Sequence, residues 1–361
     1  MNAKLLNLSN KAVEYNLYIK RKWTTLILLS FILFAVILIS ISVGSAGLPL
    51  VEVLRALFGT GEEQSRIIVW NVRMPRIATG LSVGFALAMA GCIMQNVLRN
   101  PLASASTLGV AQGASFGAAV AIIYFQAGAQ ISTAAVATIS ISNPYMVTFF
   151  AFLGGITSTA FILLLSRFSG VKPTSMILAG VALSAMFTGA TALIQYFADD
   201  MLIAAVVYWT FGNLGRAGWN EIRLILALSG AAFLYFTFNR LNYNAMESGT
   251  NTAKSLGVNV DVLILISMTV ATLISAAAIA FVGTINFIGL VAPHIVRRFV
   301  GNDYRFLIPC STIMGAVIML SADIASRMIA SPAILPIGAL TSFLGAPLFL
   351  YMIVKQGRSV K

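Results

Sequence analysis

The sequence predicts an all-α protein that crosses a membrane about ten times. Hydrophobic residues make up 59% of its 361 residues and charged residues only 9%, whereas about a quarter of a typical soluble domain is charged. A helix needs roughly 20 apolar residues to span a bilayer, and the chain contains ten runs of suitable length and character. These runs cover residues 24–43, 78–98, 107–125, 146–166, 175–197, 221–239, 261–282, 285–300, 306–326 and 336–354.

The basic residues indicate how the chain is oriented. The net charge is +12, and most lysines and arginines fall in the segments on the same side as the N-terminus. Positive charge concentrates on the cytoplasmic side of membrane proteins, and ten crossings return the chain to its starting side. We therefore expect a multi-pass protein of the cell membrane with both termini in the cytoplasm, surrounded by lipid. The excess charge then reflects orientation, and we expect no binding of nucleic acid.

One membrane domain accounts for the whole sequence. The first apolar run follows Lys20, Arg21 and Lys22, is longer than a signal-peptide core and lacks a small-residue cleavage site, so it predicts a retained helix. Nothing resembles a linker between soluble domains. We expect a cytoplasmic tail at 1–23, a transmembrane domain at 24–355 and a second cytoplasmic tail at 356–361.

Two outer segments carry local signals. After Pro49, Leu50 to Phe58 has apolar residues on one side and charged residues on the other, which predicts a short helix on the membrane surface. A second outer segment contains a cluster of aromatic residues, as expected of an aromatic belt at the interface. The aromatic residues are Tyr208, Trp209, Phe211 and Trp219.

A weak internal repeat predicts two related halves. Five residues recur at a constant offset of about 192 positions, although chance matches between small residues compete with this interpretation. They are Ala86, Ala88, Gly91, Ile93 and Pro101, which recur as Ala278, Ala280, Gly283, Ile285 and Pro293. The two copies would enter the membrane from opposite sides, as in the inverted repeats that many transporters place around a central pathway.

The inner loop at 240–260 predicts two short helices. Asn244 and Glu247 fit a capping box, and Thr250 to Leu256 forms a second short segment that Gly257 would close. Two such helices exposed to the cytoplasm would make a docking surface. An ordinary loop with local capping is the alternative.

The last third of the chain points to transport. From Ala276 to Gly357 its apolar runs are broken by Gly and Pro, with His294, Asp323 and Arg327 nearby. Broken helices are tolerated in lipid where they face protein or a water-filled cavity, which indicates a pathway. No G-x-x-x-x-G-K-[ST] motif occurs in the sequence, so any ATP must be hydrolysed by a partner and we expect no enzyme activity in this chain.

Two other classes of protein are alternatives to this hypothesis. An ion-coupled secondary transporter needs ion-binding groups within its helices, but Asp323 and Arg327 are spaced to neutralise each other. An intramembrane hydrolase could use the G-x-S-x-G match at 113–117 with His294 as base, yet that motif requires a strand–turn–helix context. Cys92 and Cys310 lie in apolar runs and predict neither a disulfide nor a metal site.

Several long motifs occur in an order that resembles a known family. They are R-M-P-R at 73–76, A-G-C-I-M-Q-N-V-L-R-N-P-L-A at 90–103, L-G-V-A-Q-G-A at 108–114, I-L-A-G-V-A-L-S at 177–184 and K-S-L-G-V at 254–258. With the C-terminal third, they resemble the FecCD-type permeases of ABC importers for iron-siderophores, haem and cobalamin.

The resemblance implies an assembly and a cargo class. Two permease copies, either identical or close paralogues, would surround a central pathway, with two ABC ATPase subunits inside and a substrate-binding protein outside. The cargo would be a metal chelate, with an iron-siderophore favoured and haem, cobalamin or an oxyanion such as molybdate as alternatives. ATP would be used by the partner subunit, and this chain itself would bind no cofactor.

The resemblance also implies three sites. Arg73, Arg76 and Arg327 would receive acidic residues of the binding protein; the alternative is that they anchor helices, with Arg327 paired to Asp323. The ATPase-coupling residues would be Glu247, Ser248, Gly249, Lys254, Ser255, Leu256 and Gly257. The cytoplasmic gate would contain Asn100, Leu102, Thr174 and Ser175, whose alternative role is to cap helices and form turns. Thr284 and Asn286 depart from the family pattern, and Asn286 could alter cargo preference.

Overall fold

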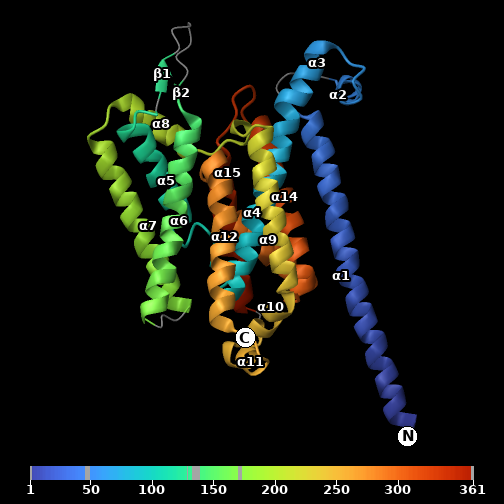
Figure 1. Cartoon of the computed structure of the whole chain (residues 1–361). Helices are drawn as coiled ribbons and strands as arrows, with labels where there is room; N and C mark the ends of the chain where they lie inside the picture. Colours follow the sequence, from blue (N-terminus) through green and yellow to red (C-terminus); the bar gives the residue numbers. More distant parts are fainter. Residues whose placement is uncertain (1, 45–48, 128, 132–138, 170–172, 359–361) are drawn as a thin grey trace.

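The computed structural model describes residues 2–44, 49–127, 129–131, 139–169 and 173–358 and is nearly all helical. Most helices run side by side in one bundle (Figure 1). The long helices are α1 (Asn2–Ser42), α4 (Met74–Val97), α6 (Pro144–Ser169), α7 (Pro173–Tyr196), α9 (Trp219–Phe238), α12 (Val260–Val282), α14 (Tyr304–Met328) and α15 (Ile337–Arg358). Shorter elements are α2 (Leu50–Leu57), α3 (Glu63–Ile67), η1 (Ile68–Arg73), α5 (Val110–Ala119), η2 (Val120–Tyr124), β1 (Ala129–Ile131), β2 (Ile139–Ile141), α8 (Asp200–Thr210), η3 (Leu214–Arg216), α10 (Arg240–Glu247), α11 (Thr250–Ser255) and α13 (Ile288–Val300).

Helix α4 forms the centre of the bundle. Nearly all of its residues are buried, and it packs against α9, α12, α13 and α14. Helices in lipid associate through close packing rather than through exclusion of water, which favours small residues at the contacts. A Cβ atom at Gly84 would lie 2.7 Å from Cα of Ala316 in α14, and one at Gly91 would overlap the backbone of Gly289 in α13. Glycine at these positions therefore allows the backbones to approach.

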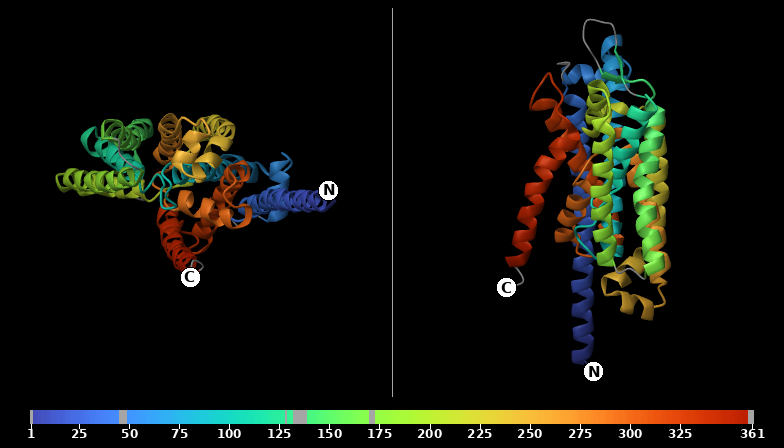
Figure 2. Two further views of the ribbon diagram at one scale, coloured as in Figure 1. Left: turned by 90° about the horizontal axis from the view of Figure 1, so that it is seen from below. Right: turned by 90° about the vertical axis from the view of Figure 1, so that its left-hand side faces the viewer.

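A second group contains α5, α6, α7 and α8, which lie together on one side of α12 (Figures 1 and 2). Gly113 of α5 faces Gly154 of α6 so closely that neither position has room for a Cβ atom. Gly117 meets the backbone of Phe150 in the same way. The G-x-S-x-G match thus lies within a helix, and its glycines serve helix packing. The hydrolase alternative lacks the strand–turn–helix context that it requires.

Each of the ten apolar runs predicted from the sequence largely coincides with a helix. Among the described residues, seven helices are long and apolar enough to cross a membrane, and α5 with η2, α13 and α15 supply shorter apolar segments for the other three runs. The number of crossings and the inverted repeat stay predictions. Helix α1 extends back to Asn2, so most of the segment predicted as an N-terminal tail is helical, and it projects beyond the bundle (Figure 1).

The outer segments differ from expectation in detail. The predicted surface helix exists as α2, but it buries Val53 and Ala56 and exposes Leu54. The second outer segment is not only a loop, because Asp200–Thr210 forms the helix α8. The aromatic-belt prediction is wrong for Trp209, which is buried in the core, while its three aromatic neighbours in the cluster are exposed. Periodicity alone did not show that this segment packs inward against α5.

The contact between α4 and α13 makes a testable prediction. Gly91→Ala places a methyl group inside the backbone of Gly289, so the two helices must separate, and overpacking of this kind costs about 1–3 kcal/mol. We expect a lower thermal unfolding temperature in detergent. Gly230→Ala is the matched control, because a Cβ atom there meets nothing within 4 Å and alanine favours a helix. Equal melting temperatures for Gly91→Ala and the unmodified protein would contradict this account of the α4 packing.

Candidate functional site

Helices α10 and α11 form an exposed surface below α9 and α12 (Figure 1). This end of the bundle, which the charge distribution predicts to be cytoplasmic, is called the inner end, and the opposite end is called the outer end. Tyr243, Met246 and Ala253 face inward and are buried. The turn between the helices uses Gly249 at φ 118°, and Gly257 follows α11 at φ 85°, both in the region that favours glycine. The predicted pair of short helices, closed by Gly257, is therefore present. Most of the coupling residues named above, namely Glu247, Ser248, Lys254, Ser255, Leu256 and Gly257, are exposed.

The predicted capping box in this loop is wrong. Helix α10 begins at Arg240, directly after α9, so Asn244 lies in the middle of a helix and Glu247 is its last residue. The Asn244 side chain instead accepts a hydrogen bond from the backbone N–H of Tyr304 (2.8 Å), in the first turn of α14. The Glu247 carboxylate accepts hydrogen bonds from Asn96 and Asn302. Both side chains therefore join the loop to other helices.

A polar network extends from this loop to three membrane helices. Asn96 of α4 donates to the carbonyl of Tyr243 (3.1 Å), and Asn302 lies in the turn between α13 and α14. Asp303 in the same turn accepts hydrogen bonds from Asn244 (3.2 Å) and from Lys22 of α1 (3.1 Å). Lys22 is almost fully buried, with Tyr18 and Phe306 beside its ammonium group. Helix α10 is therefore joined directly to α4 and to the α13–α14 turn, and it is joined to α1 through Asp303.

Asp303 is held in its charged form. Burial by itself would raise the pKa of this carboxyl group, but hydrogen bonds from Arg305, Lys22 and Asn244 outweigh it and bring the pKa well below its usual range. Paired with Lys22 and Arg305, Asp303 is the ionic centre of the inner network. The pair formed by Asp303 and Lys22 was not predicted from the sequence. The one signal for it was the position of Lys22 at the edge of an apolar run.

The three arginines predicted to receive the binding protein lie together at the outer end. Arg76 Nε contacts Asp323 Oδ1 at 2.7 Å, and Arg327 Nε contacts Asp323 Oδ2 at 3.0 Å. Arg73 Nη1 donates to the carbonyl of Ile41 (2.6 Å). Arg327 also donates to the Ser40 hydroxyl (2.8 Å) and to the carbonyl of Val43. The carbonyls that end α1 are thus capped by arginine side chains.

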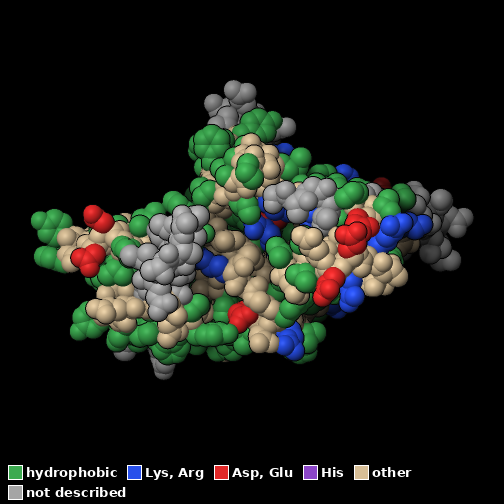
Figure 3. Space-filling model, turned by 90° about the horizontal axis from the view of Figure 1, so that it is seen from above, with side chains coloured by type: hydrophobic (Ala, Val, Ile, Leu, Met, Phe, Trp, Pro, Cys, Tyr) green, Lys and Arg blue, Asp and Glu red, His purple; other side chains and the backbone are tan. Residues whose placement is uncertain are grey.

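This outer arginine cluster, defined as Arg73, Arg76 and Arg327, carries more positive than negative charge. Asp323 is its one carboxylate within ion-pair distance among the described residues, and the negative end of α1 supplies only a partial charge. Arg73 Nη2 is buried without a hydrogen-bond acceptor from the described residues. Lys and Arg side chains are visible between apolar ones in the middle of the outer face (Figure 3). The charge balance favours binding of an additional carboxylate, although the side chains are largely buried.

The four predicted gate residues lie in two turns at the inner end. Asn100 Oδ1 accepts a hydrogen bond from the backbone N–H of Leu102 (2.7 Å), in the turn that follows α4. Leu102 is exposed, as are Thr174 and Ser175 in the first turn of α7. The Asn100 hydrogen bond is the local turn-forming role that was considered as an alternative. The gate itself stays a prediction.

Comparison with known proteins identifies the family. The model of the FecCD transport family matches residues 32–355. The chain belongs to this family. One relative is MJ0087 of Methanocaldococcus jannaschii, which is named as an ABC transporter permease protein. It is 50% identical over 96% of this chain and 99% of its own length. The hemin transport system permease protein HmuU of Yersinia pestis is 32% identical over 91% of this chain and 96% of its own length.

A solved structure shows the same fold. An inward-facing ABC transporter, provisionally assigned to the metal-chelate type, matches with a TM-score of 0.77 and 27% identity, covering 92% of this chain and 99% of that chain. The iron(3+)-hydroxamate import system permease protein FhuB of Bacillus subtilis is 32% identical over 89% of this chain and 80% of its own length. This FecCD family member is therefore a multi-pass ABC transporter permease, and several of its relatives are named for the import of iron(3+)-hydroxamate, hemin and Fe(3+)-citrate.

The inner network predicts a specific pH dependence. Because the folded-state pKa of Asp303 is depressed, its stabilising effect is complete above the unfolded-state pKa of about 3.9 and is lost as pH falls toward the folded-state value. We expect Asp303→Asn to lower the melting temperature at pH 7 and to differ less from the unmodified protein near pH 3. The test is to measure the melting temperatures of both proteins in detergent between pH 7 and pH 3.

Asp261→Asn provides the matched control for this experiment. Asp261 is highly exposed and lies 3.9 Å from Lys254, so its pair should contribute little. A difference between Asp303→Asn and the unmodified protein that stays constant from pH 7 to pH 3 would contradict the ionic role of Asp303.

Proposed function

We propose that this chain is the membrane-spanning subunit of a binding-protein-dependent ABC importer that moves a metal chelate into the cytoplasm. The observation that carries the proposal is the exposed pair α10–α11, which is joined through Glu247 and Asn244 to α4 and to the α13–α14 turn. A surface that binds an ATPase subunit must be exposed, and it must also be connected to the helices that move when ATP is hydrolysed. The α10–α11 surface meets both conditions.

The energy would come from two ABC ATPase subunits that dock on this surface. The sequence has no phosphate-binding loop of the G-x-x-x-x-G-K-[ST] type, which supports hydrolysis by a partner and not by this chain. Leu256 and Lys254 stand exposed at the end of α11 and offer one apolar and one charged contact. Both termini would then lie in the cytoplasm, because the N-terminal end of α1 and the C-terminal end of α15 lie at the same end of the bundle as α10–α11 (Figures 1 and 2).

A second permease copy would complete the pathway. Helix α15 stands at the edge of the bundle (Figure 2) and exposes the apolar side chains of Phe343, Leu344 and Leu350. An apolar groove of about 270 Å³ runs along its contact with α13 and α14. Asn286, whose Nδ2 is 3.4 Å from Ser342 Oγ of α15, would then lie near the outer part of the pathway.

The cargo we propose is an iron-siderophore. Relatives named for iron(3+)-hydroxamate, hemin and Fe(3+)-citrate import support the metal-chelate class, and haem, cobalamin and molybdate are the alternatives. An ion-coupled secondary transporter is a weaker candidate, because the buried Asp323 is already neutralised by Arg76 and Arg327 and is not free to bind a coupling ion. The binding protein would select the cargo and dock near the outer arginine cluster.

Reconstitution tests the proposal. Proteoliposomes that contain this chain, its ATPase subunits and the binding protein should take up ferric siderophore only with ATP. Glu247→Ala removes both acceptor oxygens, for Asn96 and for Asn302, and should reduce uptake severalfold or uncouple it from ATP hydrolysis, whereas Glu247→Gln keeps one of the two acceptor oxygens and should reduce uptake less. Uptake by this chain alone, driven by a proton or sodium gradient, would refute the importer assignment.

The outer arginine cluster makes a separate prediction. The double change Arg73→Glu with Arg76→Glu should weaken binding-protein affinity, because attraction to a carboxylate becomes repulsion, and the loss should shrink at high salt. The double change Arg55→Glu with Arg66→Glu, at two exposed outer arginines, is the control. Affinity must be measured per folded molecule, because Arg73 also caps α1. If the folded variant bound the binding protein with unchanged affinity, these arginines would have only a structural role.

A further inference from the structure

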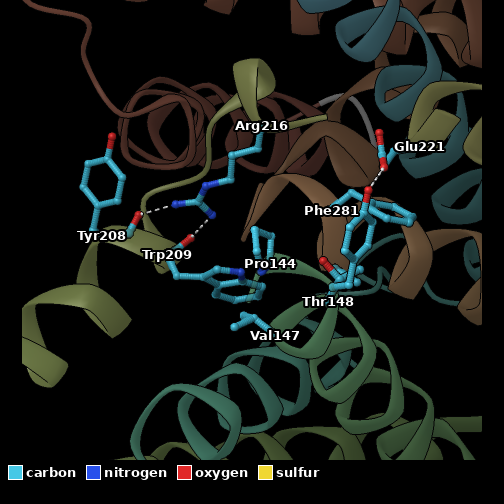
Figure 4. Close-up of a pocket in the computed structure, with 10 residues that line it drawn as sticks. Pro144, Val147, Thr148, Tyr208, Trp209, Arg216, Glu221 and Phe281 are labelled. Atoms are coloured by element: carbon cyan, nitrogen blue, oxygen red, sulfur yellow. Dashed lines mark hydrogen bonds between the residues drawn. The ribbon is translucent and has the colours of Figure 1, made fainter. Parts of the chain in front are cut away.

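A pocket of about 390 Å³ lies at the outer end of the bundle, between α6, α8, α9 and the end of α12 (Figure 4). Two charged side chains line it, Arg216 of η3 and Glu221 of α9. Neither residue belongs to the outer arginine cluster or to any other site described above.

Arg216 supplies a positive charge without an ionic partner. Its guanidinium group donates to the carbonyls of Tyr208 (2.9 Å) and Trp209 (3.2 Å) at the end of α8, and these bonds fix its position. No carboxylate of the described residues lies within 4 Å of it. Burial lowers the pKa of Arg216, but an arginine remains charged in proteins. The remaining N–H groups of the guanidinium are available to an anionic ligand.

Glu221 supplies a negative charge on the other side of the same pocket (Figure 4). Its Oε2 accepts a hydrogen bond from the backbone N–H of Gly218 (2.9 Å), and its Oε1 accepts one from the Tyr145 hydroxyl (3.4 Å). A simple anion would be attracted by Arg216 and repelled by Glu221, and a simple cation would experience the reverse. The ligand that matches both ends carries a positive and a negative group.

Most of the rest of the pocket lining is apolar. Val147, Trp209 and Phe281 contribute to its lining. One helical turn deeper, Phe149 of α6 and Leu224 of α9 expose their side chains on the faces that carry Tyr145 and Glu221. In a bilayer this surface contacts acyl chains, so a charged group in the pocket can be continuous with a hydrocarbon tail.

We propose that this pocket binds the headgroup of a zwitterionic phospholipid from the outer leaflet. The phosphate lies beside Arg216, because guanidinium groups pair well with phosphate oxygens, and the ammonium group lies beside Glu221. The acyl chains follow Phe149 and Leu224. A bound lipid would hold the outer end of α6 against the α8–α9 connection. A soluble phosphate–ammonium zwitterion presents the same headgroup chemistry, and the experiment distinguishes the two.

Native mass spectrometry of the delipidated full chain tests this proposal without a transport assay, so its outcome is independent of the proposed function. The probes are phosphatidylethanolamine and phosphatidylglycerol, added at equal concentrations. We expect the chain to retain phosphatidylethanolamine preferentially. Arg216→Gln should lower that retention by about tenfold, as expected for loss of a charge-assisted contact. Arg223→Gln, at an exposed arginine near the start of α9, should leave retention unchanged.

A second variant keeps the test decisive if Arg216→Gln folds poorly. Glu221→Gln preserves an acceptor for the Gly218 N–H and removes only the charge, so it should abolish the preference for phosphatidylethanolamine over phosphatidylglycerol. Equal retention of both lipids by the unmodified chain would overturn the proposal. Displacement of the lipid by an equal concentration of soluble glycerophosphoethanolamine would overturn the lipid assignment and identify a soluble zwitterion as the ligand.

Discussion

Close contact between helix backbones around α4 is the constraint on which the bundle depends. In lipid the apolar surface of a helix gains little by leaving its surroundings, so association depends on packing and on polar contacts between helices. Gly84 and Gly91 let α14 and α13 approach the backbone of α4, and Gly113 and Gly154 do the same for α5 and α6. The positions of the inner network and of the outer arginine cluster follow from this arrangement, because both include residues of α4.

Helix α1 illustrates how polar contacts complement this packing. Most of its apolar part is exposed, yet this part of the helix is attached at both ends. At the inner end, buried Lys22 pairs with Asp303, and at the outer end Arg73 and Arg327 donate to its terminal carbonyls. Buried charges are costly unless they are paired. These polar contacts therefore fix the position of α1 more specifically than apolar packing does. They also connect α1 to α14 twice.

The two ends of the bundle differ in what they present to partners. At the inner end the loop residues are exposed, while Asn96 and Lys22 of the network behind them are buried. At the outer end the arginine cluster is itself largely buried, and its excess charge is the feature that points to a carboxylate from outside. The pocket between Arg216 and Glu221 also lies at the outer end, but it shares no lining residue with the arginine cluster.

Apolar length and charge placement determined the class of this protein from the sequence. Ten runs predicted helices where the structure has them, the short helices α2 and α11 followed from apolar periodicity and the position of Gly257, and the ordered motifs indicated the FecCD family. A helix was expected at α10 too, but from a capping box that the structure does not contain. These signals are local in the sequence, so they can be recognised without knowing which helices pack against each other. Helix α8, the burial of Trp209 and the true role of Asn244 were decided only by tertiary structure. Asp303 meets Lys22 across 281 positions and Arg76 meets Asp323 across 247, and residues so far apart in sequence become partners only when helix packing brings their backbones together.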